Sequence, residues 1–269
     1  MRESVAEGPG RPRLAQLDLL RGAAILGVVA IHATSPFLGE MAAAGAEGTP
    51  AFRLLLAFNQ LGRYSVPGFF LMAGLLAAVV WGDRCGRPGG TRLFLRRRLA
   101  RILLPYLTWS AVFFLAPLWL RGGAGAAGVI RRLLLGETFA GGYFLVALAQ
   151  LTLLAPALLR FGAGHRRAAW GACAGLLATT EVLYCAGAYG SGDLAGGLRA
   201  GFSASLSFFY VWAAFFFGGI LIGLDRERIL GRLGGARTAA GILAAVCFAA
   251  SLWESARVHR ATGSLGLAA

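Results

Sequence analysis

Long apolar runs separated by short arginine-bearing stretches dominate this chain. A bilayer core of about 30 Å requires ~20 apolar residues per helix, because lipid cannot hydrogen-bond to the backbone and the helix must do so itself. Seven segments meet or approach this length, of which the fourth and seventh are short. They cover residues 19–38, 62–81, 102–120, 143–159, 169–188, 203–224 and 239–253. The pattern predicts an all-α, polytopic transmembrane bundle of about seven helices.

The arginines predict how this bundle is oriented. All 26 basic residues are arginine, and the formal net charge is +14. With a cytoplasmic N-terminus, 18 arginines lie in the inside segments and 8 in the outside segments. This bias follows the positive-inside rule, so we expect the N-terminus in the cytoplasm. The same distribution explains the net charge by topology and attraction to anionic lipid, which argues against a nucleic-acid partner.

Composition narrows the functional classes further. Hydrophobic residues make up 57% of the 269 residues and charged residues 14%, which excludes an ordinary soluble domain. The four cysteines form no CxxC pair and have no metal-ligand spacing with histidine, so no metal site is predicted. The first apolar run lacks a small-residue cleavage site, and we interpret it as a retained helix.

Three polar residues, His32, Gln150 and Glu181, fall inside expected membrane helices, where ionisable groups are costly and often functional. His32 follows Arg21 by 11 positions, which places the two about 20° apart around one helix and roughly 16 Å apart along it. Arginine can hold a phosphate and histidine can act as a general base. The alternative is that Arg21 anchors the topology and His32 is an interfacial or hydrogen-bonded core residue.

Other polar positions also have two interpretations. Arg98 and Arg101 lie three residues apart before Pro105 and can clamp phosphates, although such a run is also a common stop signal for insertion. Glu181 can be a proton acceptor, a partner for an arginine or a neutral buried acid. Pro67 can kink the second helix or shape a cavity wall.

Four stretches resemble the membrane-bound acyltransferase 3 family, bacterial multi-pass enzymes that O- or N-acylate sugars and other envelope molecules. The first carries the family's motif, an arginine followed by ten residues and then a histidine. The order and spacing of the stretches match the family as well. The stretches are LDLLRGAAILGVVAIH (residues 17–32), VPGFFLMAG (66–74), RRRLARILLPYLTW (96–109) and YFLVALAQLTLLAP (143–156). A weaker match, FFFGGILIG (215–223), extends the resemblance over about residues 14–235.

The resemblance implies roles for individual residues. It implies that His32 is the catalytic residue and that Arg21, Arg98 and Arg101 hold an acyl-CoA donor, with acetyl-CoA expected and no permanently bound cofactor. Candidate supporting residues are Asp18, Glu181 and Tyr143. The implied acceptor is a hydroxyl or amine of a cell-envelope saccharide or a lipid-linked molecule, at the bacterial cytoplasmic membrane.

This chain departs from the family pattern in three respects. Ala73 stands where the second motif usually has serine, and Gly141 and Gly142 stand where the fourth usually has a histidine and an aromatic residue. The family typically has about ten membrane helices. The seven expected here therefore indicate either a truncated gene product, which can be an inactive remnant, or a shortened member that closes its site as a homo-oligomer.

The resemblance also sets the expected domain boundaries. Residues 1–16 are predicted to be a cytoplasmic tail, 17–254 an acyltransferase-3-like transmembrane domain, and 255–269 a short C-terminal tail. A transporter or flippase-like protein is the rival class, since intramembrane charges fit it too. We find no pair of interrupted segments in matching halves of the chain, which an inverted repeat would give.

Overall fold

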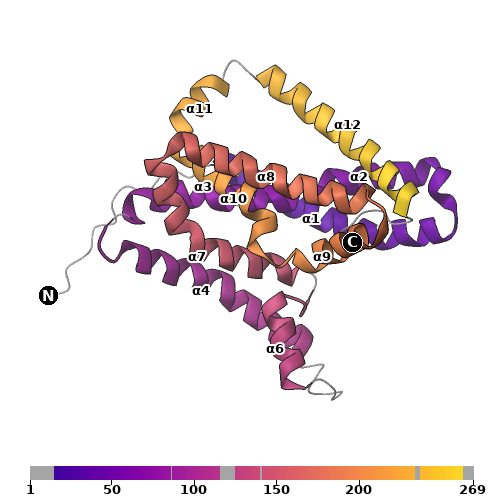
Figure 1. Cartoon of the computed structure of the whole chain (residues 1–269), viewed down its shortest axis with the longest axis horizontal. Coiled ribbons are helices and arrows are strands. Elements are labelled where there is room, and N and C mark those ends of the chain that lie inside the picture. Colours follow the sequence, from indigo (N-terminus) through magenta and orange to yellow (C-terminus); the bar gives the residue numbers. More distant parts are fainter. Residues whose placement is uncertain (1–14, 86, 116–124, 140, 234–236, 263–269) are drawn as a thin grey trace.

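The computed structural model describes residues 15–85, 87–115, 125–139, 141–233 and 237–262, and these residues form helices and turns without a strand (Figure 1). The bundle expected from the sequence is confirmed. Its long helices are α1 (Ala15–Ala43), α3 (Ser65–Cys85), α4 (Gly90–Ser110), α7 (Gly142–Gly164), α8 (Arg166–Tyr189), α10 (Phe209–Leu224) and α12 (Arg237–Thr262). Shorter helices are η1 (Ala46–Gly48), α2 (Pro50–Arg63), the π-helical η2 (Ala111–Leu115), α6 (Ala126–Leu135), α9 (Gly192–Ser205) and α11 (Arg226–Leu233).

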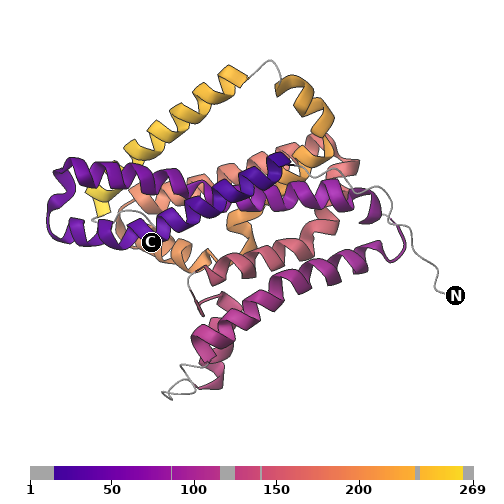
Figure 2. The ribbon, with the colours of Figure 1, turned by 180° about the vertical axis from the view of Figure 1, so that it is seen from behind.

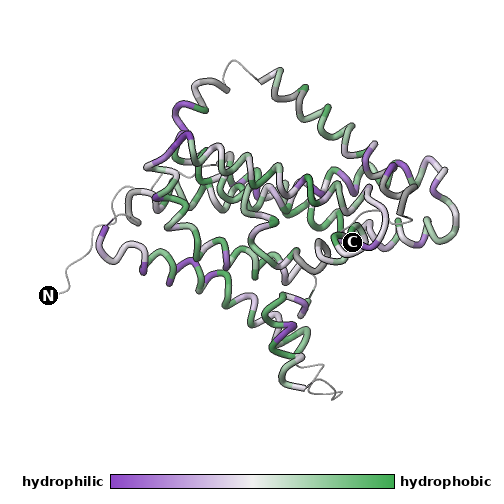
Figure 3. Tube along the Cα trace, viewed as in Figure 1, coloured by the Kyte–Doolittle hydropathy of each residue, from purple (hydrophilic) through white to green (hydrophobic). Residues whose placement is uncertain are grey.

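Five helical spans are long and apolar enough to cross a membrane. Residues 209–224 and 244–254 form shorter apolar helices, in agreement with a short seventh segment. The fourth expected segment is longer than predicted, because α7 extends over 23 residues. Figure 3 shows hydrophobic residues along the middle of α7, α8 and α10, and repeated hydrophilic positions in the first half of α4. In a bilayer, lipid would contact the apolar side chains that these helices expose.

The segment between the first two expected membrane helices, residues 39–61, is mostly helical. It holds the end of α1, η1 and most of α2. Helix α2 begins at Pro50 because Thr49 caps it, accepting a hydrogen bond from the Phe52 amide at 3.2 Å, and proline is tolerated in the first turn. Polar Asn59 and Gln60 lowered the hydropathy of this segment, yet both are buried against other helices.

Helix α3 follows α2 after a single turn residue, and the pair returns alongside α1 (Figure 2). Pro67 lies in the first turn of α3, where its missing N–H breaks no helical hydrogen bond. The expected kink at Pro67 is therefore replaced by a helix start at this position.

The tightest packing joins α3 to α10. A Cβ atom on Gly74 would meet the backbone of Phe216, and one on Gly219 would meet the carbonyl of Leu71. Gly219 and Gly223, four residues apart on α10, permit this close approach because neither carries a side chain. Gly171 and Gly175 on α8 have the same spacing, but nothing lies within 4 Å of a Cβ atom added to either.

The arginine-bearing turns meet at one end of the bundle. Figures 1 and 2 show the α3–α4 turn, the α7–α8 junction and the α10–α11 junction at this end. Arg160 at the end of α7 donates to Thr91 of α4 at 3.4 Å, and Arg166 pairs with Asp225 at 3.3 Å. These contacts bring together three of the segments that the charge count assigned to the cytoplasm.

The expected domain boundaries are only partly covered. The predicted N-terminal tail lies outside the described residues except for its last two positions. Helix α12 continues to Thr262, past the predicted boundary at residue 254.

Candidate active site

Helix α1 carries Arg21 and His32 without a break, so the two side chains share one face as the sequence predicted. Arg21 lies one turn from Asp18, and their charged groups are 3.6 Å apart. Both side chains are exposed, at 44% for Arg21 and 62% for Asp18, so this pair contributes little to stability. Its effect is to place a carboxylate beside the first arginine of the candidate site.

The face of α1 that bears Arg21 and His32 is an open flank of the bundle. The buried residues of α1, Ala24, Thr34 and Leu38, define a contact face about 100° around the helix from this pair. His32 is exposed. An apolar groove of about 930 Å³ lies between α1 and α2–α3, lined by Ala30 among others, on the side of α1 about 180° from Arg21. This groove therefore does not join Arg21 to His32.

Asn59 of α2 fixes the turn of α1 that contains His32. Its amide donates to the Thr34 hydroxyl at 2.8 Å, to the Ser35 hydroxyl at 3.1 Å and, more weakly, to the Ile31 carbonyl at 3.4 Å. The Asn59 side chain is 2% exposed, so these bonds form away from solvent. The sequence pattern did not single out this residue. The signal was present as two adjacent amides in α2, Asn59 and Gln60, and two adjacent hydroxyl residues shortly after His32.

Two prolines follow candidate site residues at the same spacing. Pro36 lies four residues after His32 and Pro105 four residues after Arg101, both inside helices. A proline has no N–H, so it cannot complete the helical hydrogen bond to the carbonyl four residues before it. Helix α4 nonetheless continues through Pro105 to Ser110. The carbonyls of His32 and Arg101 are thereby left without this helical donor.

Arg98 links three of the stretches on which the resemblance rests. Its guanidinium donates to the carbonyl of Ala73 on α3 at 3.4 Å. Arg101 lies one turn after Arg98 on α4, and the charge of Arg21 on α1 also acts on Arg98. The contact at Ala73 uses the backbone, so the alanine that replaces the family's serine still provides it.

The candidate supporting residues Glu181 and Tyr143 lie on α8 and α7. Glu181 is an exposed residue of α8, a helix that packs against α7, α9, α10 and α12, and the nearby charge acting on it is Glu254 of α12. Tyr143 begins α7 and stacks on Trp212 of α10, with ring centroids 6.5 Å apart. The neighbours described for these two residues are thus on α12 and α10, and their supporting role stays a prediction.

Gln150, the third intramembrane polar residue, has a structural role. Its amide donates to the Ser207 carbonyl at 3.1 Å and accepts from the Phe209 N–H at 3.0 Å. Phe209 is the first residue of α10, so this side chain satisfies one of the free donors at that helix start.

The arrangement offers three guanidinium groups near one end of a helix face and an imidazole farther along it. Among the described residues, no group of three His, Cys, Asp or Glu side chains is placed to hold a metal ion. Phosphate binding and proton transfer are the chemistry that these four side chains can perform.

A comparison with protein families finds a match to a family model. The acyltransferase 3 model, described as an acyltransferase domain, matches residues 14–266, which is farther toward the C-terminus than the sequence motifs reach. Comparisons with curated proteins and with solved structures give no match.

Proposed function

We propose that this chain, which belongs to the acyltransferase 3 family, moves an acetyl group from acetyl-CoA to a cell-envelope acceptor. Membership in the family and the apolar helices make it a multi-pass membrane acyltransferase in general terms. The specific proposal is an acyl-CoA donor, a hydroxyl or amine of a saccharide or lipid-linked molecule as acceptor, and the bacterial plasma membrane as location.

The observation that carries this proposal is that Arg21 and His32 share one face of α1, while Arg98 of α4, whose guanidinium feels the charge of Arg21, contacts α3. Coenzyme A is an anionic donor with phosphates at one end and a thioester at the other. Arginines near the cytoplasmic end suit the phosphates, since guanidinium groups bind phosphate oxygens through paired hydrogen bonds. His32 lies roughly 16 Å farther along α1, in the direction that the pantetheine arm would take.

His32 then acts as the general base. Its imidazole takes the proton from the acceptor hydroxyl or amine as the oxygen or nitrogen attacks the thioester carbonyl. The new C–O or C–N bond forms and the C–S bond breaks. The electron pair leaves on the coenzyme A sulfur, which takes the proton back from the imidazolium. Asn59 supports this step by holding the turn of α1 from Ile31 to Ser35.

Transfer of label from radiolabelled acetyl-CoA tests the proposal. The parent chain, His32→Ala and His32→Gln are compared in lipid nanodiscs, with label measured in water and in an added envelope-saccharide fraction. We expect both variants to lose roughly 10²- to 10⁴-fold in transfer while still binding donor. His165→Ala serves as the control, since His165 stacks on Phe161 at the α7–α8 junction.

Unchanged transfer in His32→Ala would remove the catalytic assignment. Donor binding without turnover in the parent would show that this chain alone does not complete acyl transfer.

A further inference from the structure

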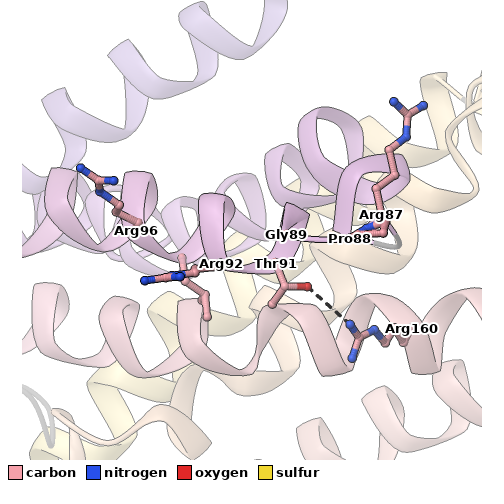
Figure 4. Close-up of a pocket in the computed structure, with 8 residues that line it drawn as sticks. Arg87, Pro88, Gly89, Thr91, Arg92, Arg96 and Arg160 are labelled. Atoms are coloured by element: carbon pink, nitrogen blue, oxygen red, sulfur yellow. Dashed lines mark hydrogen bonds between the residues drawn. The ribbon is translucent and has the colours of Figure 1, made fainter.

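A second group of arginines surrounds a pocket of about 780 Å³ between the first turns of α4 and the end of α7. Four of its lining residues are Arg87, Arg92, Arg96 and Arg160. Figure 4 shows Arg160 reaching across to Thr91, with Arg92 and Arg96 farther along α4 and Arg87 in the turn before it. The arginines therefore line an open strip and do not converge on one point.

This strip is not neutralised by the described residues. No acidic residue lines the pocket, and no described carboxylate lies within 4.0 Å of these four guanidinium groups. Arg166, at the same end of the bundle, is paired with Asp225 at 3.3 Å and shows the contrasting arrangement. Guanidinium groups without carboxylate partners are free to bind an anion through charge-assisted hydrogen bonds.

The strip is separate from the proposed donor site. Arg92 and Arg101 are nine residues apart on α4, which places them about 180° apart around the helix. Arg98, which contacts Ala73 of α3, does not line the pocket. Helix α4 thus carries two groups of arginines on different faces.

Exposed leucines continue the pocket face of α4 into the membrane. Leu103 and Leu107 follow Arg96 by 7 and 11 residues, which places them about 20° to either side of it around the helix. Their exposed fractions are 38% and 54%. The distance from Arg96 to Leu107 along the axis is roughly 16 Å, about the depth of one leaflet of a 30 Å core. A soluble phosphate would use only the arginines, whereas a phospholipid would use the leucines as well.

We propose that this strip binds the phosphate headgroup of an anionic phospholipid of the inner leaflet, with an acyl chain along Leu103 and Leu107. The pocket lies at the end of the bundle assigned to the cytoplasm, where anionic headgroups are found, and basic pockets between membrane helices are suited to them. The bound lipid neutralises guanidinium groups at the α4–α7 junction. This site does not depend on acyl transfer.

Native mass spectrometry of the full chain tests the proposal, with phosphatidylglycerol and phosphatidylcholine titrated separately. Arg92→Gln combined with Arg160→Gln removes two pocket arginines. Arg97→Gln combined with Arg167→Gln removes the same charge from exposed positions at the same end, outside the pocket lining. We expect the pocket variant to bind phosphatidylglycerol roughly 10- to 30-fold more weakly than the parent, and the control variant to remain within about threefold.

Inorganic phosphate and adenosine 3′,5′-bisphosphate, which carries phosphates of the kind found in coenzyme A, are added as competitors. We expect neither to displace phosphatidylglycerol from the parent. Displacement by the bisphosphate would reassign the strip to a soluble phosphate ligand. Equal weakening in both double variants would also overturn the proposal, because the overall positive charge of this end would then explain binding. Equal binding of phosphatidylcholine and phosphatidylglycerol by the parent would overturn it as well, because the site would then not select an anionic headgroup.

Discussion

Asn59 donates a hydrogen bond to the Thr34 hydroxyl at 2.8 Å and thereby joins α2 to the turn of α1 that contains His32. Asn59→Ala removes this bond and those to Ser35 and Ile31. We expect the free energy of unfolding to fall by about 1–3 kcal/mol, since buried partners lose a donor. Unfolding in mixed micelles with rising SDS fraction measures this. Thr180→Ala is the control, because Thr180 is not buried and bonds only within α8.

The same variant separates a positioning role from a purely structural one. If Asn59 positions His32, acyl transfer falls at temperatures where the variant is fully folded, while acyl-CoA affinity is unchanged. A loss of transfer that only follows the unfolded fraction would limit Asn59 to stabilising the α1–α2 pair.

The glycines of α10 and α8 predict opposite effects of alanine. Gly219→Ala forces a Cβ atom against the Leu71 carbonyl, and we expect destabilisation of about 1–3 kcal/mol. Gly171→Ala adds a methyl group into open space within a helix, and we expect stabilisation of up to about 1 kcal/mol. SDS unfolding of both variants checks the signs. A stabilised Gly219→Ala would contradict the close approach of α3 and α10.

Removing Arg98 and Arg101 tests the predicted donor site. Arg98→Ala with Arg101→Ala should weaken acetyl-CoA binding roughly 10- to 100-fold, because hydrogen bonds to charged phosphates are lost. The loss should be larger at low salt, where phosphate charges are least screened. Calorimetric titration at two ionic strengths measures it, with Arg131→Ala at the other end of the bundle as control. Equal affinity in parent and double variant would rule out the phosphate clamp.

Asp225 is the shared partner of two α8 residues. It pairs with Arg166 at 3.3 Å and accepts from the Trp170 ring N–H at 3.3 Å. The Asp225 side chain is only 20% exposed, so Asp225→Ala should destabilise the chain by about 1–2 kcal/mol. Glu227→Ala, at a nearby exposed pair, should have a smaller effect. Equal unfolding midpoints for these two variants would indicate that the α8–α10 junction contributes no measurable stability.

Hydropathy predicted the long helices well because lipid demands uninterrupted apolar helices, and this demand leaves a strong pattern in sequence. It missed α2, because polar Asn59 and Gln60 lower the mean hydropathy, while the Asn59 amide donates to α1 and the Gln60 side-chain oxygen accepts from Ser251 of α12. Hydropathy alone cannot anticipate such partners, since they come from another part of the chain.

The arginines of the candidate site were predictable as residue types at given spacings, but their contacts were not. The Arg98 bond to Ala73 joins positions 25 apart, through a backbone carbonyl that carries no side-chain signal. The Gly171 spacing resembled that of Gly219, yet only the latter faces a helix. Small residues permit close approach, and the neighbouring helices decide where it occurs.

Ala73 and Gly74 are adjacent on α3, and each has a different partner. The carbonyl of Ala73 holds Arg98, whereas Gly74 lies against the backbone of Phe216 on α10. Any movement of Arg98 that shifted α3 would therefore have to separate the two helices that fit most closely. Arg98 is thus held against the closely packed α3–α10 pair, and an anion bound there would have to fit the guanidinium where it stands.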